Sequence, residues 1–214
     1  MGKYNYITSK VARNIISTLK NSYKQLNQTN RKCDLEVGEY FDEKSNVEFD
    51  VELQVEFCLR FKDNFLIDGC VYSEMDTPQI IIKIGLDETQ KWKLLSQLYP
   101  ELKEIIRHEI EHLTQRGINE KSGKYCRRNN AVRQKIMFDI LPSYRYYILK
   151  DEVDANIQGL YVKAKALKIP FQIVIDRYLN NLVDMGTIKE GEKKRIYKVW
   201  KKRIPKIGGI PKLN

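Results

Sequence analysis

Histidine and cysteine are scarce in this chain, which contains two histidines and four cysteines among 214 residues. The cysteines are widely spaced and form no CxxC pair, which argues against a zinc knuckle and against a dense disulfide framework. No apolar run approaches the roughly 20 residues that a membrane-spanning helix needs. The N-terminal segment also lacks the apolar core of a signal peptide. These absences favour a cytoplasmic protein that is neither exported nor anchored.

The charge of the chain is unbalanced, with 38 basic residues against 28 acidic ones and a formal net charge of +10. Most of the excess lies after residue 188, where ten lysines and arginines accompany two glutamates. Such a patch attracts nucleic acid or an acidic partner, although a charge run also serves simply as a solvated helix face. Any nucleic-acid binding through residues 193–203 should be non-specific, because no DNA-reading motif is present.

Hydrophobic periodicity predicts an α+β fold. Strict alternation of apolar and polar residues over 47–61 is typical of a strand in a sheet that is packed on one side. Further strands are predicted at 35–41, 65–72 and 80–84, with a possible turn at 68–69. They should form a small, mainly antiparallel sheet that packs on helices.

Helical spacing of apolar residues predicts a first helix over 7–26 and a helical C-terminal half. Pro100 and Gly117 suit the start and the end of another helix, followed by a loop over 116–130. The later helices are predicted at 131–140, 151–167, 171–185 and 190–204. We interpret residues 1–186 as one domain and 187–214 as a basic amphipathic helix and tail, docked through Trp200.

Both histidines belong to one motif, His108-Glu109-Ile110-Glu111-His112, on a predicted helix. Residues four apart share a helical face, so His108 and His112 can reach one metal ion. Glu109 follows the first ligand directly, where its carboxylate can take a proton from an attacking water. A catalytic zinc site needs a third protein ligand, and with no histidine left it must be Asp, Glu or Cys. The best segment is 151–159, in which Asp151 is best placed as a helix cap.

The HExxH motif followed by Glu152, Ala155 and Asn156 resembles the glutamate zincins, in which a helix carries E-x-x-A-[ND]. The chain lacks the transmembrane segments of the HtpX-like group and is more similar to the soluble ImmA/IrrE-like peptidases of phages and mobile elements. The resemblance implies a zincin-like fold in which Glu152 is the third zinc ligand and Asn156 holds a ligand histidine. Asp154 is the rival ligand. An apolar-proline segment that follows the glutamate in that family has no good counterpart here.

Together, the motif and the resemblance predict a zinc metallopeptidase with Glu109 as general base. By analogy with zincins, the strand at 80–84 should form the edge to which a peptide substrate adds as a further strand. The aromatic cluster at Tyr144, Arg145, Tyr146 and Tyr147 either packs in the core or stabilises an oxyanion. The alternative function is a catalytically inactive zincin scaffold that binds nucleic acid or a protein partner through its basic tail.

Overall fold

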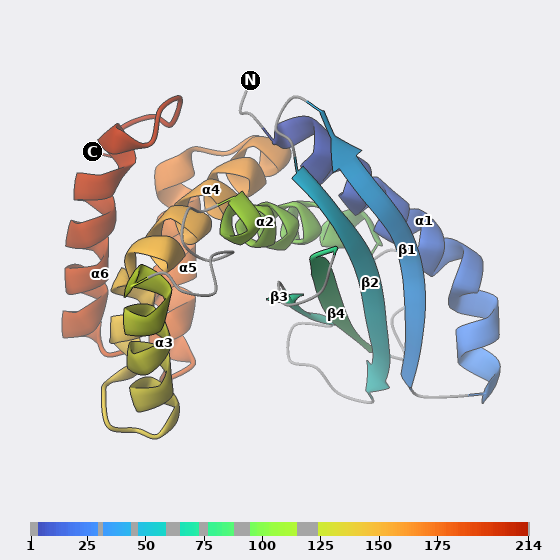
Figure 1. Ribbon diagram of the computed structural model, residues 1–214, viewed down its shortest axis with the longest axis horizontal. Coiled ribbons are helices and arrows are strands. Elements are labelled where there is room, and N and C mark those ends of the chain that lie inside the picture. The colour runs from blue at the N-terminus through green and yellow to red at the C-terminus, as the bar shows by residue number, and fades with distance from the viewer. Residues whose placement is uncertain are drawn as a thin grey trace. The chain divides into compact units, whose positions relative to one another are not determined.

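The computed structural model describes residues 4–29, 32–43, 47–58, 65–72, 77–87, 95–114 and 124–213. The helices and strands are α1 (Asn5–Thr29), β1 (Lys32–Asp42), β2 (Val47–Cys58), β3 (Phe65–Tyr72), β4 (Gln79–Asp87), α2 (Leu95–Thr114), α3 (Lys124–Met137), η2 (Ser143–Ile148), α4 (Lys150–Leu167), α5 (Phe171–Asp184), α6 (Glu190–Arg203) and η3 (Ile204–Lys206) (Figure 1). The predicted α+β class is confirmed, with a helical C-terminal half. Contacts divide the chain into two compact units, Met1–Leu113 and Thr114–Asn214. This division differs from the one predicted at residue 186, because α6 belongs to the second unit.

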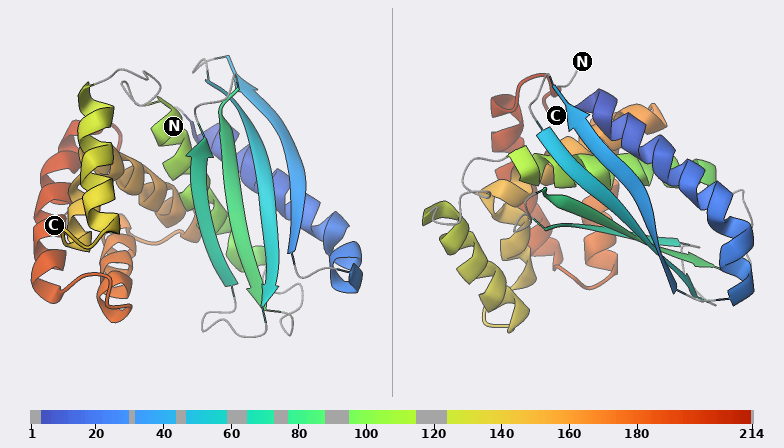
Figure 2. Two further views of the ribbon diagram at one scale, coloured as in Figure 1. Left: turned by 60° about the horizontal axis from the view of Figure 1, so that its bottom comes forward. Right: turned by 45° about the vertical axis from the view of Figure 1, so that its right-hand side comes forward.

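The first unit contains a four-stranded sheet of strand order β1-β2-β4-β3 (Figure 2). The two outer pairings are antiparallel, and the central pairing of β2 with β4 is parallel. The alternation predicted for β2 places one row of its side chains in the core: Val47, Phe49, Val51, Leu53 and Val55. Apolar residues of α1 and α2 join the same core cluster, so both helices cover the apolar face of the sheet. The opposite face carries the polar residues of β2.

Two predictions about this sheet are wrong. Residues 80–84 lie in β4, which is an interior strand between β2 and β3, and not at an edge. Its isoleucines occupy consecutive positions. An uninterrupted apolar run of this kind is typical of an interior strand that has a neighbour on each side. Asp68 and Gly69 form no turn, because they pair with Lys83 and Ile82 in the middle of β3. The strand at this end of the described sheet is therefore β3.

Helix α2 starts earlier than predicted, at Leu95, so Pro100 lies inside the helix. A proline in the sixth position removes one backbone hydrogen bond near the N-terminus, where few such bonds have yet formed. The apolar residues Leu98 and Leu102 are fully buried on either side of it, and their packing outweighs the loss. The predicted helix end at Gly117 lies outside the described residues.

The second unit consists of helices around its own core. This core joins apolar residues of η2, α4, α5 and α6, and the side chains of Ile196, Trp200 and Ile204 are completely buried in it. The predicted loop over 116–130 is wrong in its described part, since α3 begins at Lys124. Among the residues that the structure describes, no helix has both the length and the apolar character required to cross a bilayer.

Candidate metal centre

Helix α2 places both histidines of the motif on one side of the first unit's core. Its apolar residues Leu102, Ile106 and Ile110 are fully buried in that core. His108 and His112 are half-buried, and their Nε2 atoms approach to 3.0 Å. Their rings meet edge to face, with centroids 4.7 Å apart. The four-residue spacing thus gives the predicted convergence of two imidazole nitrogens.

Glu109 lies on the side of α2 that faces β3, and it is only 6% exposed. The contact requires a glycine on the strand. A β-carbon added to Gly69 would lie 2.5 Å from Ile105 Cγ2 and 3.1 Å from Glu109 Oε1. Gly69 therefore allows the close approach of strand and helix that confines the Glu109 carboxylate.

The same carboxylate affects the pKa of Cys70, the next residue of β3. Burial raises the pKa of the Cys70 thiol, the charge of Lys83 opposes the rise, and the negative charge of Glu109 adds to it. The thiol is free and partly buried. A raised pKa keeps it protonated at neutral pH, so it is a poor nucleophile or metal ligand.

Helix α4 carries two adjacent buried carboxylates in its first turn, Asp151 at 3% exposure and Glu152 at 1%. Arg133 of α3 donates from Nη2 to Asp151 Oδ2 at 2.5 Å and to Glu152 Oε1 at 2.6 Å. Asn129 donates to the other oxygen of Asp151 at 2.8 Å. The prediction that Asp151 caps the helix is wrong: Leu149 occupies the cap position and makes no side-chain cap. Asp151 is bound to α3 instead.

Arg133 stays charged in this setting. Burial disfavours its cationic form, but the hydrogen bond to Glu152 and the charge of Asp151 outweigh burial and raise its pKa above the ordinary value. Buried carboxylates need such a partner, because removing a charge from water costs several kcal/mol.

The rival ligand, Asp154, is engaged elsewhere in the second unit. Arg203 of α6 binds it as a fork, with Nε and Nη2 each 2.6 Å from one carboxylate oxygen. A bidentate arginine occupies the positions from which a carboxylate would bind a metal. This contact favours Glu152 over Asp154 as the third ligand.

Asn156 lies one turn after Glu152 and is also buried. Its Nδ2 donates to the Glu152 carbonyl at 2.7 Å, and its Oδ1 accepts from the Tyr178 hydroxyl at 3.1 Å. The first bond lies within α4, and the second ties α4 to α5. The predicted role of Asn156 in holding a ligand histidine stays a prediction.

The aromatic cluster of η2 divides between two environments. Tyr144 is a core residue, with Arg145 and Arg195 against its ring. The pKa of Tyr147 is raised by burial and further by the negative charge of Glu152. Tyr147, one of the four predicted oxyanion candidates, is thus close enough to Glu152 for the charge of that carboxylate to affect its pKa.

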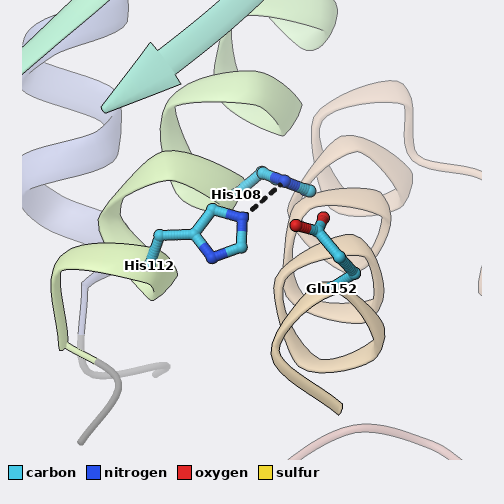
Figure 3. Close-up of side chains that lie close together, drawn as sticks. All are labelled: His108, His112 and Glu152. Carbon is cyan, nitrogen blue, oxygen red and sulfur yellow. Dashed lines mark hydrogen bonds between the residues drawn. The ribbon is translucent and has the colours of Figure 1, made fainter. Parts of the chain in front are cut away.

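One ligand atom of each of His108, His112 and Glu152 lies within 4.8 Å of the others, so this group could hold a metal ion (Figure 3). Two imidazole nitrogens and a carboxylate oxygen are the donors of a catalytic His₂Glu zinc site. Tetrahedral zinc with bonds of about 2.1 Å would hold two nitrogens about 3.4 Å apart. The observed 3.0 Å between the histidines is close to that separation.

Two residues that contribute to this region were missed by sequence reasoning. Gly69 stood inside a predicted turn, and Arg133 precedes Glu152 by 19 residues without any motif spacing. Neither carries a local signal, because each acts through a contact between separate elements. No family model, curated protein or solved structure matches the chain.

Proposed function

We propose that this chain is a zinc-dependent peptidase, with His108, His112 and Glu152 as metal ligands and Glu109 as general base. The observation that supports it most is the grouping of these three ligand atoms, donors of the type that catalytic zinc uses. The burial of Glu109, next to the first ligand and against β3, supports its role.

Zinc at this centre would polarise the scissile carbonyl and lower the pKa of water toward neutrality. Glu109 accepts the proton of the attacking water on its carboxylate and returns it to the leaving amine. Tyr147 is the donor that we assign to the developing oxyanion, because the charge of Glu152 acts on its phenol and the two side chains are therefore near each other. The remaining protein groups hold these side chains in place.

The substrate would be a peptide in extended conformation. Strand β3 is the last strand of the described sheet on the side of β4, and it contacts Glu109 through Gly69. A peptide that pairs with this strand gains main-chain hydrogen bonds and passes the general base. This assignment replaces the edge predicted at 80–84.

Metal analysis and a peptide-library digest test the proposal. We expect one zinc per chain in protein purified without chelators, and cleavage that stops when the metal is removed and returns with zinc. The matched variant His112→Ala should lose both zinc and cleavage. Protein that neither contains zinc nor takes it up, and that cuts no peptide, would contradict the assignment.

A second candidate function is the binding of a polyanion, which the exposure of the α6 lysines favours. The exposed cations after residue 188 are Lys189, Lys194, Arg195, Lys198, Lys201, Lys202, Lys206 and Lys212. Nucleic acid bound there would dissociate steeply with salt, since each neutralised phosphate releases counterions. Under this alternative, Glu109→Gln leaves the function unchanged.

Charge reversal tests this alternative better than truncation, because removing α6 would also remove Trp200 from the core. Lys198→Glu/Lys202→Glu should abolish DNA retention at low salt. The control Arg13→Glu/Lys20→Glu changes the net charge equally at exposed positions of α1. An equal loss of DNA retention in both double variants would mean that retention depends on net charge and not on the position of the lysines.

A further inference from the structure

The first turn of α4 shows an arginine shared between two carboxylates. Nη2 of Arg133 binds both Asp151 Oδ2 and Glu152 Oε1, and both carboxylates are almost completely buried. Arg133 itself comes from α3, and its guanidinium lies 6.0 Å from the centre of the Tyr146 ring. Contacts with Asp151 and with the Tyr146 ring therefore help to fix the guanidinium that donates to Glu152.

We propose that Arg133 is the positioning residue of the third metal ligand. The inference rests on the proposed function, because it takes Glu152 as that ligand. Arg133 engages Glu152 through one oxygen, Oε1. A zinc-bound carboxylate needs only one oxygen for the metal, and the hydrogen bond to the other fixes the direction in which the first one points.

The second arginine–carboxylate pair of α4 shows what distinguishes this arrangement. Arg203 binds both oxygens of Asp154 at 2.6 Å. The two guanidinium side chains are almost equally exposed, 31% for Arg133 and 30% for Arg203. Both pairs anchor α4 to another helix, but only Arg133 touches the proposed ligand. Arg203 is therefore a matched control for the purely structural effect of losing such a pair.

Asp151 and Asn129 complete the arrangement. Asp151 accepts from Arg133 on one oxygen and from Asn129 on the other, so it fixes the guanidinium as well as receiving from it. A lysine at position 133 would keep the charge, but its ammonium is a point charge on a flexible stem and lacks the fixed donor directions of the planar guanidinium. It should thus restore metal affinity only in part.

The test measures zinc affinity by competition with a chromogenic chelator, at one pH and below the unfolding temperature of each variant. Arg133→Gln should weaken zinc binding by about 10- to 100-fold, the range typical of partners that orient a ligand. Arg133→Lys should have a zinc affinity between those of Arg133→Gln and the natural protein. The zinc affinity of Arg203→Gln should stay within about threefold of that of the natural protein. The visible spectrum of bound Co²⁺ should change in Arg133→Gln and not in Arg203→Gln.

Zinc affinity of Arg133→Gln equal to that of the natural protein would overturn the inference, as would an equal loss in Arg203→Gln. If either Gln variant fails to fold, Arg133→Lys and Arg203→Lys replace them. The first should then bind zinc more weakly than the second, and equal affinities overturn the inference. Absence of zinc binding in the natural protein would instead overturn the proposed function. The two failures are therefore distinguishable.

Discussion

At the scale of single residues, side chains of the same type have different surroundings in and around the candidate centre. Glu109, Glu111 and Glu152 are all glutamates of helices. Glu109 is confined against Gly69, Glu111 pairs with Arg107 at 2.7 Å, and Glu152 is held by Arg133. Environment thus separates a candidate base, a structural ion pair and a candidate ligand.

The general base gives the first prediction. Glu109→Gln keeps the shape of the side chain but cannot accept and return a proton. We expect the rate of peptide cleavage to fall by about 10²- to 10⁴-fold while zinc content and thermal unfolding remain unchanged. Steady-state kinetics with metal analysis on the same sample measure both. Cleavage by Glu109→Gln at the natural rate would exclude Glu109 as the base.

Tyr147 gives the second prediction. Tyr147→Phe removes the phenolic donor and keeps the ring contacts with Tyr146 and Tyr178. If Tyr147 stabilises the oxyanion, kcat should fall by about 10²- to 10³-fold with little change in zinc affinity. Tyr146→Phe, which removes the neighbouring hydroxyl, is the control. A loss of similar size in both variants would count against a specific role for Tyr147.

At the scale of elements, the contact between β3 and α2 is tighter than most. In Gly69→Ala, the new methyl group would overlap Ile105 and press on Glu109. We expect the free energy of unfolding to fall by about 1–3 kcal/mol, as in other overpacked sites, and cleavage to fall further. Urea unfolding measures the first effect. Gly191→Ala in α6 is the control, since a β-carbon there meets nothing within 4 Å.

Trp200 is the largest side chain that α6 buries in the core of the second unit. The indole is fully buried, and its Nε1 donates to the Tyr147 carbonyl at 2.9 Å. Trp200→Ala should destabilise the protein by about 3–5 kcal/mol, the cost of emptying a large core site. Lys201→Ala, an exposed neighbour, should change stability by less than about 0.5 kcal/mol. Denaturant unfolding of both variants compares the effects, and similar stabilities would contradict the packing described for α6.

At the scale of the whole molecule, the proposed ligands lie far apart in the sequence. His108 and His112 belong to α2, and Glu152 belongs to α4. An ion bound by all three would stabilise the folded chain by mass action, by about 2.7 kcal/mol at a hundredfold excess over its Kd.

Chelation therefore gives the fifth prediction. Removing zinc should lower the Tm by roughly 5–10 °C for a chain of this size, and adding zinc back should restore it. Differential scanning calorimetry with and without chelator measures the shift. In Glu152→Ala, removing zinc should change the Tm only slightly. A full shift in Glu152→Ala would mean that α2 binds the ion without Glu152.

Much of the fold follows from the sequence because it depends on local periodicity. The alternation in β2 and the three- and four-residue spacing in α4, α5 and α6 predict these elements closely. The pair His108 and His112 is likewise local, since a helix brings residues four apart to one side. The sequence by itself therefore determined most of the elements, the two imidazoles that α2 brings together and the glutamate beside them.

Only the tertiary structure decided what depends on contacts between distant segments. Strand order made β4 interior and β3 the outer strand, because pairing partners are chosen by sheet assembly and not by the pattern within a strand. Arg203 engaged Asp154, while Arg133 reached Glu152 from a different helix. Burial makes such partners necessary, since an unpaired charge inside a protein is costly, and burial is a property of the assembled chain.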